Sequence, residues 1–354
     1  MPDETGRSQS TDGSGRDDKG PGAGAGQPLD ERHIAPDEDG RQSTQQNDDQ
    51  NSEHVADRGK MGPETPLIEG LSEDVVPAVE EFMEQAAQQN EAAAAEVAAE
   101  AGDAKPGAYI SFEKVSKAFG DFVVLKDVSF CVNSGETLCI LGRSGVGKSV
   151  SLQMLLGFLK PDTGVVRVAG EDITAFSERE LQAIRRKVTM VFQNGALFDS
   201  ITVGENVAFP LRERGELAEE QIYQIVKGLL EMVGVAGMDS LLPSDLSTGM
   251  KRSVAIARAL ASQPEAVLYD EPTTQVDPLM GHLLGDLIER LKQQLHLTSI
   301  VVTHDMRFAK KLADKVVFLH EGTARFFGTM EEMESSQDPT LQQFLALDAL
   351  VLPA

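Results

Sequence analysis

One segment in the middle of the chain combines glycines, a lysine and a serine in a spacing suited to binding phosphate: Gly142, Arg143, Ser144, Gly145, Val146, Gly147, Lys148 and Ser149. Glycines let backbone N–H groups approach phosphate oxygens without Cβ clashes. Lys148 can reach the β- and γ-phosphates of a nucleoside triphosphate, and the Ser149 hydroxyl can ligate Mg²⁺. The segment therefore predicts a site for a nucleoside triphosphate with Mg²⁺.

The residues on either side predict the elements that must position this loop. Residues 137–141 form an apolar run typical of a buried strand, and residues 149–158 carry leucines at helical spacing. A strand, a glycine-rich loop and a helix in this order place the loop at the positive end of the helix, where anions are stabilised.

Two further segments carry groups suited to the same chemistry. The apolar run 266–269 ends in Asp270 and Glu271. Asp270 is placed to hold Mg²⁺, and Glu271 is placed to polarise an attacking water as a general base. Ser247 and Gly249 precede a helical pattern at 253–260, so they are expected at a helix N-terminus that can hold an anion.

Short apolar runs alternate with helical patterns, which predicts an α/β fold with a parallel sheet. Residues 109–142 and 165–173 read as short strands with turns, so we expect an antiparallel β layer beside that sheet. A mostly helical insert predicts a helical subdomain at about 197–260. We see no internal repeat, so one nucleotide-binding domain is expected.

The formal net charge is −25 over 354 residues, and residues 1–105 carry the larger part of this excess. An acidic balance argues against a nucleic-acid partner, which would need a basic face. We predict that residues 1–70 form a disordered acidic tail, because few of them are large and apolar. Residues 71–105 read as a possible amphipathic helix and linker. Whether that helix is solvated, or docks on the core or on a partner, stays open.

The two cysteines, Cys131 and Cys139, lie in apolar runs and are expected to be buried free thiols; a disulfide or metal pair is the alternative. The chain shows no apolar run long enough to span a bilayer and no apolar signal-peptide core at its N-terminus. We therefore expect a cytosolic protein that meets the membrane through a partner.

The segment Leu246-Ser247-Thr248-Gly249 resembles the Leu-Ser-Gly-Gly signature of ABC ATPases, and the other motifs follow in that family's order. The resemblance implies a P-loop ABC ATPase with an antiparallel β layer, a RecA-like parallel sheet and a helical subdomain over residues 106–335. Residues 336–354 would be a C-terminal extension. It also implies that the Ser247 loop binds the γ-phosphate of ATP held by a second copy, and therefore a homodimer.

The resemblance assigns four further residues. Gln193 looks like the glutamine that senses Mg²⁺ and water, and His304 looks like the histidine that contacts the γ-phosphate. Asp277 is similar to the aspartate that crosses the dimer interface. Phe119 is similar to the aromatic residue that stacks on adenine. ATP, Mg²⁺ and a catalytic set of Glu271, His304 and Gln193 follow as expectations.

Two residues depart from the family pattern. Thr248 replaces the first glycine of the signature, and Gln275 replaces a glycine usual before Asp277. A threonine at position 248 is tolerated at negative φ and strained at positive φ. Slow hydrolysis, or a nucleotide-bound scaffold without turnover, is therefore an open alternative.

Residues 192–203 and 205–211, together with 303–306 and 338–345, resemble the ATPases of Mce/Mla-type lipid transporters. This implies a peripheral ATPase on the cytoplasmic face of the inner or plasma membrane, with permease subunits, an MCE-type lipid-transfer protein and a small regulatory subunit as partners. An importer ATPase for amino acids or other small solutes is the alternative, and a role on DNA or ribosomes is disfavoured. We expect deletion of residues 1–105, which the resemblance does not cover, to leave ATPase activity largely intact.

Overall fold

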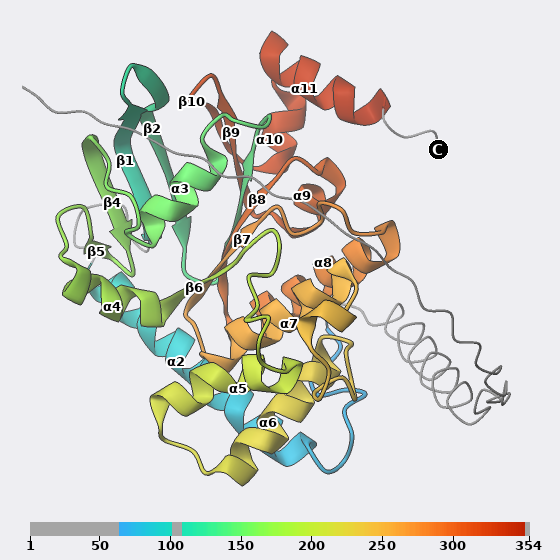
Figure 1. Cartoon of the computed structure of the whole chain (residues 1–354). Coiled ribbons are helices and arrows are strands. Elements are labelled where there is room, and N and C mark those ends of the chain that lie inside the picture. The colour runs from blue at the N-terminus through green and yellow to red at the C-terminus, as the bar shows by residue number, and fades with distance from the viewer. Residues whose placement is uncertain (1–63, 101–107, 351–354) are drawn as a thin grey trace, which may run out of the picture. The chain divides into compact units, whose positions relative to one another are not determined.

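The computed structural model describes residues 64–100 and 108–350 of the chain. The prediction of a disordered tail falls largely on residues outside these segments. The described segments form two sheets with helices packed against them, and helices α5, α6 and α7 lie together at one end (Figure 1). The predicted α/β class, with an antiparallel layer and a parallel sheet, is confirmed.

The antiparallel sheet has the strand order β2-β1-β4-β5. Its strands are β1 (Ala108–Phe119), β2 (Phe122–Asn133), β4 (Thr163–Val168) and β5 (Glu171–Asp172). A tight turn at Gly120, where φ is +60°, joins β1 to β2. This turn lies within residues 109–142, which the sequence predicted to form short strands with turns.

The second sheet of the described chain has the order β10-β9-β3-β8-β7-β6, and its strands are parallel apart from the β9–β10 pair. The strands are β3 (Thr137–Leu141), β6 (Val188–Val191), β7 (Ala266–Asp270), β8 (Thr298–Thr303), β9 (Lys315–His320) and β10 (Thr323–Gly328). All five residues of β3 are buried, as expected for a strand covered on both faces.

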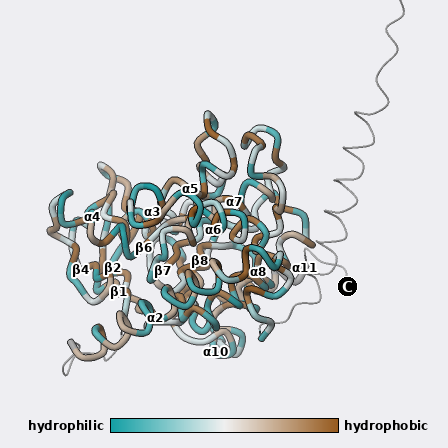
Figure 2. The backbone as a smooth tube through the Cα atoms, turned by 90° about the horizontal axis from the view of Figure 1, so that it is seen from below, coloured by the Kyte–Doolittle hydropathy of each residue, from teal (hydrophilic) through white to brown (hydrophobic). Residues whose placement is uncertain are grey.

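Alternate residues of the central strands point into two different cores. Leu138 and Ile140 join the core between the two sheets, which also holds apolar residues of helix α3 (Lys148–Leu155). Cys139 and Leu141 join the core on the opposite face. The central strands β7 and β8 are largely hydrophobic in Figure 2.

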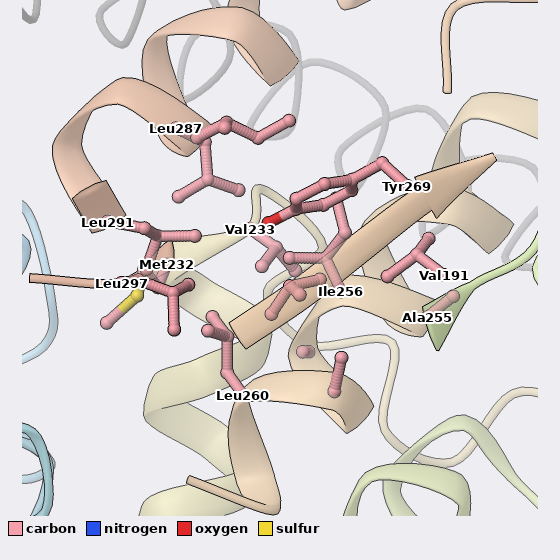
Figure 3. Close-up of a cluster of buried hydrophobic side chains, with 14 of the residues drawn as sticks. Val191, Met232, Val233, Ala255, Ile256, Leu260, Tyr269, Leu287, Leu291 and Leu297 are labelled. Carbon is pink, nitrogen blue, oxygen red and sulfur yellow. The ribbon is translucent and has the colours of Figure 1, made fainter. Parts of the chain in front are cut away.

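Helices α7 (Thr248–Ala261) and α8 (Pro278–Leu295) supply much of that second core. Figure 3 shows Tyr269 of β7 lying among Ile256 of α7 and Leu287 and Leu291 of α8. The remaining helices are α4 (Glu178–Lys187), α5 (Val203–Arg214), α6 (Glu219–Met232), η1 (Pro243–Asp245), α9 (Met306–Leu312), α10 (Met330–Ser335) and α11 (Pro339–Leu350).

Residues near the N-terminal end of the described chain form helix α2 (Val76–Glu100), which packs against α6, α8 and β1. Val75, Val79 and Phe82 are buried in the core that also contains α7 and α8. Of the two alternatives for this segment, solvated or docked, the structure therefore shows a docked helix.

Cys139 is buried, and burial raises the pKa of its thiol well above the ordinary range. Cys131 is only partly buried, because it lies on the opposite face of β2 from the buried Phe130 and Val132. The prediction of two buried free thiols is thus correct for Cys139 and wrong for the burial of Cys131. None of the helices in the described segments is long and apolar enough to cross a bilayer.

Candidate functional site

The site lies at the carboxyl ends of β3, β8 and β7, which are neighbours in the parallel sheet. Leu141 of β3 pairs with Thr303 of β8, and Asp270 of β7 pairs with Val302 of β8. The loop after β3, Glu271 after β7 and His304 after β8 therefore converge at one sheet edge, where ligands of such folds bind.

A pocket at this edge is lined by phosphate-loop residues and by residues from five other segments. Its lining consists of Val124, Gly142, Arg143, Ser144, Gly145, Gly147, Lys148, Ser149, Val150, Gln193, Glu271, Thr274, His304 and Phe344. The sequence-predicted residues of the loop, apart from Val146, thus share one pocket with Gln193, Glu271 and His304.

Two glycines of the loop have no room for a side chain. A Cβ at Gly142, where φ is +148°, would lie 2.5 Å from the carbonyl oxygen of Leu319. A Cβ at Gly147, where φ is +102°, would lie 2.5 Å from Leu125. The loop is therefore pressed against β2 and β9, and glycine is required at both positions.

Lys148 is the first residue of α3 and is 7% exposed. Its Nζ donates hydrogen bonds to the carbonyl oxygens of Gly142, at 2.8 Å, and Arg143, at 3.1 Å. The same Nζ lies 3.3 Å from Oε1 of Glu271. The Lys148 side chain therefore folds back over the phosphate loop, and its charged Nζ faces the pocket.

Ser149 and Asp270 form a second polar pair. The Ser149 hydroxyl donates to Oδ1 of Asp270 over 3.1 Å. Burial raises the pKa of Asp270, and the hydrogen bond from Ser149 opposes that shift. A hydroxyl beside a carboxylate provides the hard oxygen ligands that Mg²⁺ prefers, so the two residues fit this ion.

Glu271 has a left-handed backbone, with φ +48°, and its N–H donates to the carbonyl oxygen of Val302 at 2.9 Å. Non-glycine residues rarely adopt this conformation, and strained backbone of this kind concentrates at functional sites. Its Oε2 lies 2.7 Å from Nδ1 of His304 and accepts from the Thr274 hydroxyl at 3.3 Å.

The predicted residues Ser247, Gly249 and Asp277 also lie outside this pocket. Ser247 caps α7, where its hydroxyl accepts from the N–H of Met250 at 3.3 Å. Asp277 caps α8 in the same way, accepting from the N–H of Met280 at 3.0 Å. A Cβ at Gly249 would contact Met280, so the two capped ends lie side by side.

Phe119 lies at the end of β1, is 49% exposed and does not line the pocket. Its ring lies 5.6 Å from Nζ of Lys117. The adenine-stacking role proposed for Phe119 stays a prediction.

The two departures from the signature pattern differ in backbone geometry. Thr248 is the first residue of α7 and is not among the described residues with positive φ, so its Cβ is accommodated. Gln275 has φ +62°, a conformation that costs a side-chain-bearing residue roughly 1–2 kcal/mol. Of the two residues that replace a family glycine, only Gln275 therefore has a strained backbone.

Two residues of this region were missed from the sequence. Arg252 is 3% exposed and donates to the carbonyl oxygens of Gln193, at 3.1 Å, Pro272, at 2.7 Å, and Thr274. It therefore joins α7 to the loops that follow β6 and β7. Phe344 of α11 lines the pocket and packs on Phe318, with ring centroids 4.7 Å apart. No sequence signal singles out Arg252, because α7 also carries Lys251 and Arg258. The position of Phe344 depends on tertiary packing alone.

Residues 125–274 match the family model described as ABC transporter. The chain is 42% identical over 226 residues to an intermembrane phospholipid transport system ATP-binding protein of Haemophilus influenzae, covering 64% of this chain and 86% of that protein. The chain belongs to the ABC transporter family of ATP-binding proteins.

Other family members agree with this assignment. This ABC protein is 36% identical over 239 residues to a probable ribonucleotide transport ATP-binding protein of Mycobacterium leprae, covering 68% of this chain and 69% of that protein. It also resembles a dimeric ATP-binding cassette in a post-hydrolysis state with ADP and Pi. That match has a TM-score of 0.59 and 31% identity, over 62% of this chain and 98% of the cassette.

Proposed function

We propose that this chain is the ATP-hydrolysing subunit of a transport complex that moves phospholipid between membranes through a separate permease. The observation that carries the enzymatic part is the convergence of Lys148, Glu271 and His304 in one pocket, beside the Ser149–Asp270 pair. The lipid part is supported by the names of similar proteins, which include the phospholipid transport ATP-binding proteins of Haemophilus influenzae and Escherichia coli.

The phosphate loop and the polar side chains near it have proposed roles. The backbone N–H groups of the phosphate loop and Lys148 bind the β- and γ-phosphates. Glu271 accepts a proton from the attacking water, and His304 contacts the γ-phosphate and positions the carboxylate. Mg²⁺, held by Ser149, Asp270 and Gln193, would neutralise charge on the phosphate oxygens.

Ser247, Gly249 and Asp277 lie outside the pocket of their own chain, and this supports a site completed by a second copy. A two-fold dimer would place the Ser247 loop of each copy against the ATP of the other. Phe119 would stack on adenine, and residues 106–335, with a helical subdomain at about 197–260, would form the catalytic domain.

An exposed aromatic pair supports a permease-binding surface. Phe198 and Phe209 are 46% and 47% exposed, and their ring centroids lie 5.2 Å apart. The loop that carries Phe198 is built on the buried Asn206 side chain, which bonds to the backbone of Phe198 and Thr202. An exposed aromatic pair on a loop held by hydrogen bonds suits a peripheral subunit that binds a membrane partner. An MCE-type protein and a small regulatory subunit complete the proposed complex.

The proposal is tested by isolating the Glu271→Gln chain from solubilised membranes and identifying the proteins and lipids that copurify. We expect a permease and enriched phospholipid to copurify with the Glu271→Gln chain. If assembly depends on the ATP-loaded dimer, neither should copurify with the Lys148→Ala chain in the presence of ATP. Copurification of a permease with enriched nucleotide or amino acid in place of lipid would reject the lipid assignment. Failure of the complex purified with the unmodified chain to hydrolyse ATP would reject the enzymatic assignment.

A further inference from the structure

The segment of residues 64–100 joins parts of the protein that are far apart in sequence, and the proposed ATPase chemistry does not account for it. Helix α2 runs beside α6 and reaches α8 and β1 (Figure 1). Its far end also contacts the outer sheet, because Val97 lies opposite Gly170. We call residues 64–100 the strap.

The contact between the strap and α6 is closely fitted. A Cβ added to Gly228 of α6 would lie 2.1 Å from Cγ2 of Val79. Glycine inside a helix costs roughly 1 kcal/mol relative to alanine, so this glycine is explained by the space that Val79 occupies. Three residues further along α6, the buried carboxylate of Glu231 accepts from the Ser72 N–H at 2.8 Å and from its hydroxyl at 2.9 Å.

The strap also holds the C-terminal half of α8. Arg290 donates to the carbonyl oxygens of Thr65 and Pro66, at 3.1 and 2.7 Å. Gln294 donates to Thr65 at 2.6 Å and accepts from the N–H of Leu67 at 2.7 Å. The amide of Asn90, a buried side chain on α2, donates to the carbonyl oxygen of Leu295 at 2.7 Å.

A third set of bonds reaches Gln263, the second residue after the end of α7. The Gln263 amide donates to the carbonyl oxygen of Phe82 at 2.8 Å, and Gln89 donates to the carbonyl oxygen of Gln263 at 3.4 Å. Gln263 is 8% exposed and has φ +46°. The strap therefore holds the C-terminal ends of both α7 and α8.

The N-terminal ends of the same two helices carry Ser247 and Asp277. Helices are stiff, so fixing their far ends relative to each other also fixes the relative position of their capped ends. We propose that the strap is a positioning device that holds the Ser247 and Asp277 loops in the arrangement a second copy of the chain must meet. This inference rests on the proposed function, because those loops act only if a second copy supplies the ATP they contact.

The test uses the full chain with two small substitutions in the strap, Ser72→Ala and Val79→Ala, combined. Glu84→Ala is the matched control, because Glu84 lies on the exposed side of α2. A third chain combines Val79→Ala with Gly228→Ala, which returns a methyl group to the space that the smaller residue leaves. If the double strap variant fails to fold, Ser72→Ala alone is measured.

The first readout is hydrogen exchange of the nucleotide-free chain, well below its melting temperature. We expect peptides covering 247–256 and 277–286 to exchange about fivefold faster in the strap variant, with peptides of the phosphate loop unchanged. The Glu84→Ala chain should match the unmodified protein, and Val79→Ala with Gly228→Ala should recover much of its protection. A lower melting temperature with no change in these peptides would overturn the proposal, since the strap would then only add stability.

The second readout is ATP-driven dimerisation in the Glu271→Gln background. We expect the strap variant to need at least about fivefold more protein for half-dimerisation, with ATP affinity of the monomer within about twofold. Equal dimerisation in the two chains would overturn the positioning role and leave the proposed function intact. The strap variant could also show faster exchange at both capped ends while the chain with an unmodified strap fails to dimerise with ATP. That result would support the positioning role and reject the two-copy site.

Discussion

Oε2 of Glu271 lies 2.7 Å from Nδ1 of His304, at the ends of two neighbouring parallel strands. The other carboxylate oxygen lies 3.3 Å from Nζ of Lys148. One carboxylate is thus shared between the proposed phosphate-binding lysine and the proposed γ-phosphate contact. Arriving phosphate oxygens would compete with Glu271 for Lys148, so ATP binding would free the carboxylate to accept a proton from water.

Glu271→Gln should lower ATP turnover by at least about 100-fold, because an amide cannot accept the proton of the attacking water. ATP binding should persist, and an ATP-loaded dimer should accumulate in size-exclusion chromatography with light scattering. Glu220→Gln, on the exposed first turn of α6, is the control and should behave as the unmodified chain. Normal turnover in the Glu271→Gln chain would refute the assignment of the general base.

Lys148→Ala should weaken ATP binding by at least roughly 100-fold, because it removes the charge that faces the phosphates from a buried position. Isothermal titration with ATP measures this. Lys160→Ala is a matched control, since Lys160 also donates to two backbone carbonyls, those of Ala175 and Phe176, but lies outside the pocket. Equal losses in both variants would point to a folding defect instead of a lost phosphate contact.

Arg252→Lys should lower turnover roughly 10- to 100-fold with little change in ATP affinity. An ammonium group cannot reproduce the guanidinium fork that bonds to three separate carbonyl oxygens, so the Gln193 loop loses its fixed position. Steady-state kinetics separate kcat from KM. Arg185→Lys, at an arginine that bonds to the carbonyl of Leu156 away from the pocket, should leave both constants unchanged. A KM effect alone would argue against this positioning role.

Gln275→Gly should raise the free energy of unfolding by about 1 kcal/mol, because glycine adopts φ +62° without the cost that a Cβ imposes. Urea denaturation of both chains measures the difference. Gln275→Ala is the control, since alanine keeps the strained Cβ and should bring no such gain. An unchanged midpoint for the glycine variant would show that the surroundings relieve the strain already.

Phe198→Ala should leave ATP hydrolysis by the isolated subunit unchanged and weaken permease binding by at least about 30-fold, as expected for an exposed aromatic anchor. Copurification from membranes and a lipid-transfer assay measure the loss. Phe122→Ala removes a side chain that is 66% exposed at the β1–β2 turn, and should have no effect on either. Retained permease binding in the Phe198→Ala chain would place the docking surface elsewhere.

Sequence patterns predicted the elements around the site because each has a local cause. A buried strand before a glycine loop, or a carboxylate pair after an apolar run, is visible without knowing the fold. The contacts of Arg252 and Phe344 were not visible in this way, since both depend on which loops the sheet order brings together. The docking of α2 was left undecided for the same reason: the partner of Val79 is a glycine 149 positions later in the chain.

The packing of the strap against the core also bears on where the protein can be shortened. Deletion of residues 1–105 was expected to be harmless, but the described structure places Val75, Val79 and Phe82 in the main core. A chain beginning near Tyr109 would present an apolar channel along α6 and α8 to solvent, and such a surface favours aggregation. A shortened protein for biochemical work should therefore keep residues 64–100.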